Sequence, residues 1–341
     1  MAINQLDSRP SAAAVTAAVA LAVRAPSIHN TQPWRWVYGP QGLDLYADRG
    51  RQLAAIDPDG RGLLVSCGAA LYLASLGLAG QGWLSQVRLF PDPADADLLA
   101  RIVPAEHRQP VEEPTMALVA AAQRRRTERR PFRPDPVSVQ LLDLLCRLDE
   151  GEGVYAHLIR RPEDRLDLAV VMSWADQLEI EDEAYRTELA RWVRPDAASA
   201  REGVPPSAVP HLAEGQQRHA AVPVRDFEVG RTGGQEIPAG VDEQPAWLVV
   251  FTATDDAAAR LHAGQAYARI AVEAERLGLT TSAATQAVDL PGVRERVRAL
   301  MDWPDHPQMM LRVGWPPPGD PAPPTPRHPA EAVLTIIDPA G

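Results

Sequence analysis

Apolar residues recur at helical spacing along several Ala- and Leu-rich stretches of this chain of 341 residues. Residues 11–24 and 63–78 are the clearest of these stretches, and Pro26 ends the first. Residues 255–277 form a third, which ends before Gly278, a residue type common just after the last helical turn. Less regular patterns predict further helices over 98–103, 115–126, 139–148 and, in two pieces, 163–194.

Shorter segments alternate apolar and polar residues and predict strands. Residues 34–38 and 43–46 alternate on either side of Gly39-Pro40, which indicates a hairpin. Residues 246–252 are apolar almost throughout, so we expect this strand to be buried on both faces. The other expected strands cover 87–90, 154–160, 309–313 and 332–337.

Residues 195–240 differ in character from the rest of the chain. They are rich in Pro and Gly and hold few periodic apolar residues. Structureless segments of this length are uncommon in compact domains and are usually functional or disordered. We therefore interpret the segment as a long ordered loop or a lid. A second Pro-rich stretch, 316–326, is interpreted as a tether before the last strand.

An internal repeat is visible between two of the predicted helices. Gly68-Ala-Ala precedes Gly82 by 14 residues, and Gly264-Gln-Ala precedes Gly278 by the same 14 residues. The two copies lie 196 residues apart, and similar predicted elements surround both. The pattern favours an internal duplication, although two unrelated Gly/Ala helices could produce the same spacing.

The charge pattern narrows the classes of function. The net charge of −11 argues against nonspecific affinity for nucleic acid or an anionic membrane. The chain has no lysine, and all 34 of its basic residues are Arg. This excludes enzymes that hold pyridoxal phosphate on a lysine, and it excludes phosphate loops with the sequence GK[ST]. Any phosphate must be held by Arg, hydroxyl or backbone N–H groups.

Other classes of site find little support in the sequence. Two cysteines, Cys67 and Cys146, are too few for a disulfide framework, and the eight His residues show no metal-ligand spacing. Asp57-Pro-Asp59-Gly60 is interpreted as a turn, because the Glu that would complete a calcium loop is missing. The Ala-rich run near the N-terminus lacks a basic start and a cleavage site. We therefore expect a cytoplasmic protein without a bound metal.

The most distinctive polar stretch is APSIHNTQPW at 25–34. Its prolines fix the backbone, so Ser27 and Asn30 offer hydrogen bonds in a fixed geometry. Such a loop suits the binding of a planar polar ring. A structural turn that leads into the strand at 34–38 is the alternative.

The densest basic cluster is RRRTERR at 124–130. In an extended segment Arg125, Thr127 and Arg129 would share one side. Arg forks and a hydroxyl are good donors for a phosphate monoester, and Arg327 would add another donor. A solvated charged face or an interdomain cluster of salt bridges is the alternative for 124–130, and an ordinary surface position is the alternative for Arg327.

These stretches together resemble the FMN-dependent nitroreductase superfamily. APSIHNTQPWRWVY is similar to its APSxxNxQPWxF motif, and RRTERRPF to its RRSxRxF motif, with Thr127 in place of Ser and one extra residue before Phe132. Residues 263–279 resemble its core helix, and LRVGWP at 311–316 and PRHP at 326–329 resemble its C-terminal motifs. The order of APS before RRT resembles the mycobacterial Acg-like branch, whose members duplicate the fold in one chain.

The resemblance implies an α+β, three-layer α/β/α nitroreductase-like fold, duplicated within one chain. The first half would cover 1–110 and the second 111–341, with a lid-like insertion at about 195–240. Residues 1–10 hold no RRS motif, and 149–153 are a degenerate counterpart of the PSxxN loop. One FMN per chain is therefore implied, in a pseudo-dimer that is monomeric or weakly homodimeric.

The resemblance also implies which residues hold the cofactor. The first half would supply Ser27, Ile28 and Asn30, and the second half Arg125, Thr127, Arg129 and Arg327 on the phosphate side. Ala283 and Thr285 would face the flavin where many relatives carry Pro-x-Glu-Gly, so the side chains there depart from the family pattern.

The implied function is that of an oxidoreductase. NAD(P)H would reduce FMN, and reduced FMN would pass electrons to a nitroaromatic, quinone or related small-molecule acceptor in ping-pong order. No side chain is assigned as an acid or base. The alternatives are a flavin-binding or flavin-sequestering protein with a lid over FMN, and a duplicated fold that has lost FMN.

Overall fold

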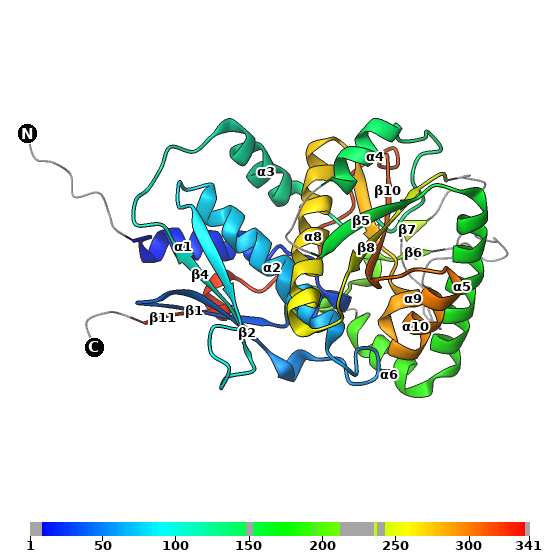
Figure 1. The fold of residues 1–341 in the computed structure, drawn as a ribbon, viewed down its shortest axis with the longest axis horizontal. Helices are drawn as coiled ribbons and strands as arrows, with labels where there is room; N and C mark the ends of the chain where they lie inside the picture. The colour runs from blue at the N-terminus through cyan, green and yellow to red at the C-terminus, as the bar shows by residue number, and fades with distance from the viewer. Residues whose placement is uncertain (1–8, 148–152, 195, 212–234, 237–242, 338–341) are drawn as a thin grey trace, which may run out of the picture.

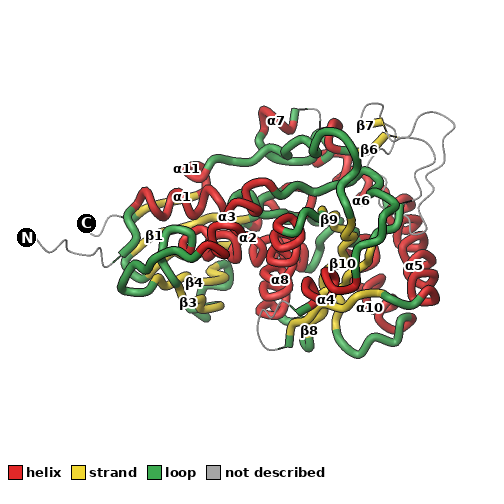
Figure 2. Tube along the Cα trace, turned by 90° about the horizontal axis from the view of Figure 1, so that it is seen from above, coloured by secondary structure: helices red, strands yellow, loops and turns green. Residues whose placement is uncertain are grey.

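A computed structural model describes residues 9–147, 153–194, 196–211, 235–236 and 243–337. Two β-sheets lie on either side of a central pair of long helices (Figures 1 and 2). The pair consists of α2 (Arg61–Ala79) and α8 (Ala257–Arg276), which pack along each other. The expectation of an α+β fold is confirmed.

The first sheet has five strands in the order β11-β1-β2-β4-β3. β1 (Trp34–Gly39) and β2 (Gly42–Ala47) form the expected hairpin around Gly39-Pro40. Their Trp36 and Leu45 side chains pair across the hairpin and are buried in one cluster with residues of α1 (Ala12–Ala22) and α2. The other strands are β3 (Ser85–Leu89), β4 (Leu98–Pro104) and β11 (Leu334–Ile336).

The second sheet has four strands in the order β5-β8-β10-β9, and helices cover both of its faces. β8 (Ala246–Thr252) is buried throughout, as its apolar sequence predicts. Leu248 and Val250 pack toward α8 and α4 (Val139–Cys146). Val249 packs on the opposite face with α5 (Pro162–Glu181), α9 (Gln286–Asp289) and α10 (Pro291–Leu300). This half is therefore a three-layer α/β/α arrangement. The other strands are β5 (Val154–Ile159), β9 (Thr280–Ala283) and β10 (His306–Gly314).

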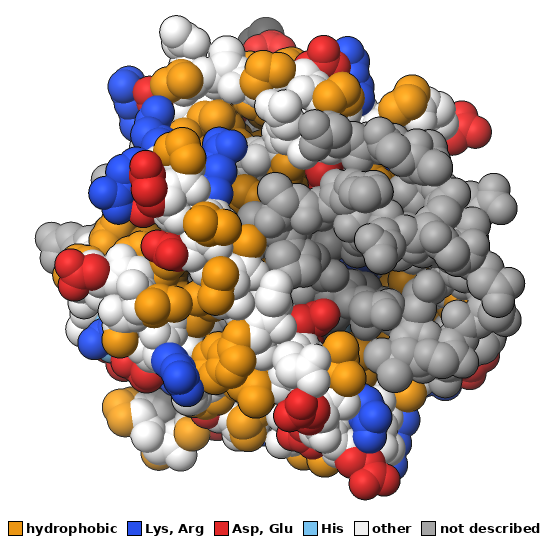
Figure 3. All heavy atoms as spheres, turned by 90° about the vertical axis from the view of Figure 1, so that its right-hand side faces the viewer, with side chains coloured by type: hydrophobic (Ala, Val, Ile, Leu, Met, Phe, Trp, Pro, Cys, Tyr) orange, Lys and Arg blue, Asp and Glu red, His pale blue; other side chains and the backbone are white. Residues whose placement is uncertain are grey.

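The predicted pair of helices over 163–194 is confirmed as α5 (Pro162–Glu181) and α6 (Glu183–Trp192). α5 lies on the right-hand side of Figure 1. Figure 3 shows this side of the molecule, and hydrophobic and charged side chains are intermingled on its described part. The remaining helices are α3 (Glu113–Arg124), α7 (Ala197–Ala200), α9 (Gln286–Asp289), α10 (Pro291–Leu300), α11 (Ala330–Val333), and the short 3-10 turns Ile28–Asn30, Arg49–Arg51 and Pro206–Ala208.

Short polar side chains begin several of these helices. Ser11, Ser138, Asp182 and Asp256 each accept a hydrogen bond from a backbone N–H in the first turn of α1, α4, α6 and α8, respectively. Such caps satisfy N–H groups that have no partner inside the helix. The helix starts are therefore fixed by local sequence.

One predicted element was wrong. Residues 98–103, expected to be helical, form the strand β4 between β2 and β3. Ile102 lies opposite Leu43 of β2 and Val87 of β3, so pairing on both sides decides its conformation. Local propensity is a weak guide for a segment this short, because tertiary pairing overrides it. The sequence patterns also missed β9 and α10.

α2 is the one described helix that is long and apolar enough to cross a membrane, and 83% of its apolar window is buried inside the fold. It packs on α1, on the first sheet and on α8. Its apolar composition is thus accounted for by its position in the core. The expected cytoplasmic location stays a prediction.

The C-terminal end of the chain returns to the first sheet. β11 pairs in parallel with β1, with Trp36 opposite Leu334. The boundary near residue 110 and the duplication itself stay predictions. Of the lid-like segment, residues 195, 212–234 and 237–240 lie outside the described residues, as do 149–152 of the degenerate PSxxN counterpart. The described remainder of that segment includes β6 (Pro210–His211), which pairs with β7 (Gln235–Glu236).

Candidate functional site

The loop between α1 and β1 is held in an unusual backbone conformation. His29, Asn30 and Gln32 have φ angles of 42°, 58° and 52°, a region that non-glycine residues rarely adopt. The N–H of Ile28 donates to Ser66 Oγ at 3.0 Å, and the N–H of Gln32 donates to Ser27 Oγ at 3.1 Å. These contacts fix the loop on the first turns of α2. Strained backbone of this kind concentrates at ligand-binding sites.

Arginines from two distant segments form a cationic cluster beside this loop. Arg125 is 6% exposed; its Nη2 donates to the carbonyl oxygen of Arg24 at 3.1 Å. Arg327 donates through Nη1 to Thr325 Oγ1 at 2.6 Å and through Nη2 to the carbonyl oxygen of Ala25 at 3.4 Å. Among the residues described, neither arginine forms an ion pair with a carboxylate.

Several donors of this cluster are buried without a partner in the described part of the chain. They are Nε and Nη1 of Arg125 and Nε of Arg327. Burial, together with the positive charges of Arg125 and Arg24, lowers the pKa of Arg327 to about 9. Burial also lowers the pKa of Arg129, to about 10. Unpaired buried donors are costly, and an anion that supplies acceptors would satisfy them.

A cavity joins the loop to the cationic cluster. Its volume is about 840 Å³ with its open mouth included. Eight of the nine predicted cofactor residues line it, namely Ser27, Ile28, Asn30, Thr127, Arg129, Ala283, Thr285 and Arg327. The ninth, Arg125, lines a smaller adjoining pocket that shares Thr127, Thr325 and Arg327 with the cavity. The structure therefore brings the predicted residues together, while their roles stay predictions.

The sequence analysis missed a buried ion pair in the cavity wall. Arg61 is 1% exposed, and its Nη2 lies 3.1 Å from Asp289 Oδ1. Arg61 Nη1 also donates to the carbonyl oxygen of Gln308. The other oxygen of Asp289 accepts from Thr285 Oγ1 at 2.9 Å. Arg61, Asp289 and Thr285 thus form one hydrogen-bonded chain along the wall that also bears Met309.

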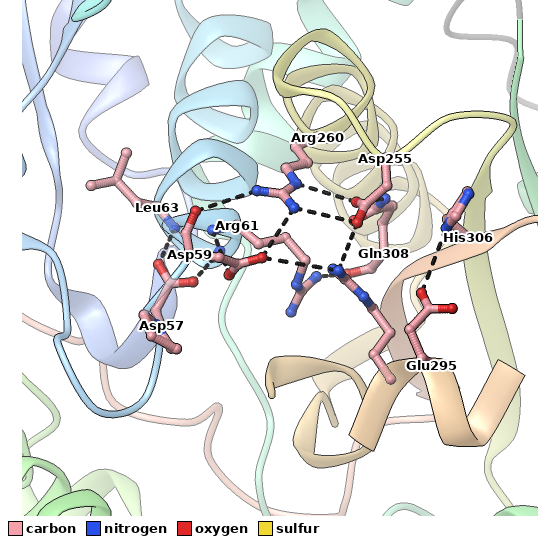
Figure 4. Close-up of polar contacts among 12 residues, drawn as sticks. Asp57, Asp59, Arg61, Leu63, Asp255, Arg260, Glu295, His306 and Gln308 are labelled. Atoms are coloured by element: carbon pink, nitrogen blue, oxygen red, sulfur yellow. Dashed lines mark hydrogen bonds and ion pairs between the residues drawn. The ribbon is translucent and has the colours of Figure 1, made fainter. Parts of the chain in front are cut away.

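A larger polar network continues behind this wall (Figure 4). Arg260 and Arg294 both bind Asp255, with nitrogen–oxygen distances of 3.2 and 2.7 Å. Arg260 also lies 3.0 Å from Asp59, so the network joins the start of α2 to the start of α8. No sequence motif marks these residues. The sequence feature nearest to them is the expected turn at residues 57–60, which precedes α2.

Asp57 fixes the start of α2. Its two carboxylate oxygens accept the N–H groups of Gly62 and Leu63 at 2.7 and 2.8 Å. Burial raises the pKa of Asp57 to about 6, although these two hydrogen bonds act in the opposite direction. The expected turn at residues 57–60 is confirmed, with Gly60 at a φ of 66°.

The described part of the predicted lid touches the loop directly. Asn30 Nδ2 donates to the carbonyl oxygens of Gly203 and Pro326, each at 2.9 Å. Gln32 Nε2 donates to the carbonyl oxygen of Arg201 at 2.8 Å. Between them, Glu202 lies 2.5 Å from Arg51 Nη1 and 3.2 Å from His328 Nε2. Residues 201–203 are therefore held over the loop by hydrogen bonds and a small ion cluster.

This set of groups fits a phosphorylated planar ligand. Guanidinium groups with free N–H and the Thr127 hydroxyl suit a phosphate dianion at one end. Backbone and hydroxyl groups of the strained loop, with Val65 and Met309, line the rest. A pocket with an apolar wall and a few converging polar groups is typical of cofactor sites. Among the described residues, no three His, Cys, Asp or Glu side chains are arranged to hold a metal.

Comparison with known sequences decides the family. No family model matches the chain. It is 37% identical over 329 residues, 95% of this chain and 92% of the relative, to the Mycobacterium tuberculosis H37Rv protein named "Putative NAD(P)H nitroreductase Rv3131". The chain belongs to the NAD(P)H nitroreductase family. The protein of the same strain named "Putative NAD(P)H nitroreductase acg" is 32% identical over 97% of this chain and 98% of that protein.

Among solved structures, a nitroreductase with bound FMN from Desulfitobacterium hafniense matches at a TM-score of 0.41 and 12% identity. The match covers 65% of this chain and 98% of that one. The assignment to the NAD(P)H nitroreductase family rests on the two mycobacterial relatives, whose similarity to this chain extends over almost their whole length.

Proposed function

We propose that the chain is an FMN-dependent oxidoreductase that takes electrons from NAD(P)H and passes them to a nitroaromatic, quinone or related small molecule. The observation that carries the proposal is the cavity in which the strained loop and the arginine cluster meet. Buried guanidinium donors without partners point to a phosphate ligand at that place. The names of the mycobacterial relatives support the choice of NAD(P)H as the electron donor.

Each part of the cavity would have a distinct task. Arg125, Thr127 and Arg327 would hold the phosphate, because they combine fixed positive charge with free donors. Ser27, Ile28 and Asn30 would border the ring, as would Ala283 and Thr285, which line the same cavity. Arg129 would add positive charge on the phosphate side. When bound, FMN supplies the ability to accept a hydride and to release electrons. The side chains of Val65 and Met309 would keep water from the ring.

We propose one such site per chain, within a monomer or weak homodimer. The repeat matches Tyr267 of α8 with Leu71 of α2, 196 residues earlier. Tyr267 lines the cavity, whereas Leu71 is fully buried in the first apolar cluster with α8 residues Leu261 and Ala268. The apolar surroundings of Leu71 support a single site per chain. Gel filtration of the purified protein tests the state of association.

The absorbance spectrum of the purified protein, with and without added FMN, tests the proposal. We expect flavin bands that correspond to about one equivalent per chain, and bleaching when NADPH or NADH is added without oxygen. A protein that neither carries flavin nor takes up FMN would contradict the proposal. Two equivalents per chain would contradict the single site.

A flavin-sequestering role is the second candidate, and the contacts of residues 201–203 favour it. Asn30 and Gln32 bind this segment, and Glu202 anchors it to Arg51 and His328. Such contacts would limit the access of NAD(P)H to a bound ring. Glu202→Ala removes the anchor. If the segment limits access, the flavin-loaded variant will be bleached by NADPH faster than the wild type, and an equal rate would exclude occlusion by these residues.

A further inference from the structure

Tyr267 lies at the junction between the cavity and the cationic cluster. It is 6% exposed on α8, and it lines the cavity together with Thr127, Arg129 and Arg327. Its ring packs in the apolar cluster of the second sheet. Within the described part of the chain, its hydroxyl has no hydrogen-bond partner. A phenol whose ring is buried usually finds a partner for its O–H group.

The charges around this hydroxyl identify the kind of partner it lacks. Burial raises the pKa of Tyr267, and the positive charges of Arg125, Arg129 and Arg327 counteract the rise, with Arg125 the strongest. Arg125 itself has two buried N–H groups without a partner among the described residues. Tyr267 lines the cavity with Thr127 and Arg327, and these two residues also line the adjoining pocket of Arg125. A ligand that accepts hydrogen bonds from the Tyr267 hydroxyl and from Arg125 would satisfy both.

The pairing of the two central helices does not require this hydroxyl. Leu71 occupies the matched position of α2, and it is fully buried in the apolar cluster that also contains α8 residues Leu261 and Ala268. An aliphatic side chain thus fills that position well. The hydroxyl of Tyr267 adds a polar group to a residue that lines the cavity together with Arg129 and Arg327.

We propose that Tyr267 is an additional ligand of the phosphate, donating its O–H to a phosphate oxygen and so favouring FMN over riboflavin. This inference rests on the proposed function, because it takes the ligand to be a flavin nucleotide. A hydroxyl that donates to an anion forms a charge-assisted hydrogen bond, which is stronger than a neutral one. Riboflavin has the same ring and ribityl chain but no phosphate, so it cannot form this bond.

The test compares the dissociation constants of FMN and riboflavin for flavin-free wild type and Tyr267→Phe, measured by calorimetry. We expect the constant for FMN to rise about tenfold in the variant, while that for riboflavin stays within about twofold. The inhibition constant of inorganic phosphate as a competitor of FMN should rise by a similar factor. Tyr38→Phe is the control, because its hydroxyl donates to the carbonyl oxygen of Pro10 at 2.7 Å, outside the cavity.

Two results would overturn the assignment of Tyr267. Unchanged FMN binding in Tyr267→Phe would remove the hydroxyl from the site. Equal losses for FMN and riboflavin would place it against the ring or ribityl chain instead. If the wild-type protein binds neither flavin, the proposed function itself is contradicted. If the wild type binds FMN and Tyr267→Phe binds it equally well, only the assignment of Tyr267 is contradicted.

Discussion

Gly68 of α2 and Gly264 of α8 lie in contact where the two central helices cross. A Cβ on Gly264 would lie 2.9 Å from the Cα of Gly68 and 2.0 Å from the carbonyl oxygen of Val65. A Cβ on Gly68 would lie 2.0 Å from the carbonyl oxygen of Leu261. The obstacles are backbone atoms, which cannot move without separating the helices. Gly68 and Gly264 thus set the distance between α2 and α8.

Gly264→Ala should therefore destabilise the protein although alanine is the better helix former. We expect the free energy of unfolding in urea to fall by about 1–3 kcal/mol, as in other overpacked cores, even after a gain of about 1 kcal/mol in helix propensity. Gly292→Ala in α10 is the matched control, because a Cβ there meets nothing within 4 Å. A Gly264→Ala variant as stable as Gly292→Ala would show that the helices separate at little cost.

The local sequence was sufficient for the elements around this crossing. The apolar runs at helical spacing predicted α2 and α8, which the structure confirms. The correspondence between the two helices that the matched Gly and Ala spacing suggests stays a prediction. β4 was missed because its Leu98–Pro104 segment is too short to show a period, and its strand state depends on neighbours on both sides. Elements whose conformation depends on distant partners carry little signal in their own residues.

The same distinction applies to the candidate site. Ser27, Asn30, Arg125 and Thr127 belong to motifs, and the structure places them around the cavity and its adjoining pocket. Arg61 resembles an ordinary charged residue at a helix start, and its partner Asp289 is 228 residues away. Tyr267 resembles a core aromatic of an Ala-rich helix. Only the tertiary structure reveals that both line the cavity.

Arg125→Ala should weaken the binding of FMN. Its two free N–H groups are buried at the cationic end, so each charge-assisted bond to a phosphate contributes about 1.5–3 kcal/mol. We expect the dissociation constant of FMN to rise about tenfold or more, measured by quenching of flavin fluorescence. Arg133→Ala is the control, because Arg133 is an exposed residue that pairs with Asp135. Unchanged flavin retention in Arg125→Ala would remove Arg125 from the phosphate site.

The affinity for FMN should fall at alkaline pH. The pKa of Arg327 is about 9 in the protein without ligand, and a bound phosphate dianion would raise it. Above pH 9, FMN binding therefore requires proton uptake, and the affinity decreases by up to about tenfold per pH unit. The measurement is the ratio of the dissociation constants of FMN and riboflavin, followed from about pH 7 to about pH 10. Effects of pH on the ring that the two ligands share cancel in this ratio. A ratio independent of pH would mean that Arg327 does not contact the phosphate.

Breaking the Arg61–Asp289 pair should lower the stability of the protein, because the removal of either charge leaves the other one buried without its partner. Both side chains are 2% exposed, and they join α2 to the segment after β9. We expect Arg61→Gln or Asp289→Asn alone to lower the free energy of unfolding by about 3–5 kcal/mol. The double variant should lose less than the sum of the two, which a double-mutant cycle in urea would measure. Additive losses would mean that the two residues act independently.

Asp57 should give the stability a pH dependence of the opposite sign to that of a salt-bridged carboxylate. Burial raises its pKa from 3.8 to about 6 in the folded protein. Between these values the folded state binds more protons than the unfolded state, so the contribution of Asp57 to the free energy of unfolding falls as pH rises. The slope reaches at most about 1.4 kcal/mol per pH unit, and the contribution is constant above about pH 6.

Asp57→Asn isolates this effect, because its side chain cannot titrate while the other carboxylates are unchanged. The stability of the wild type relative to Asp57→Asn should decrease from about pH 4 to about pH 6 and then level off. If the difference instead increases over this range, the hydrogen bonds from Gly62 and Leu63 at 2.7 and 2.8 Å outweigh the cost of burying the charge. The start of α2 would then favour the carboxylate form, and the first turn of the helix would act as an anion site in its own right.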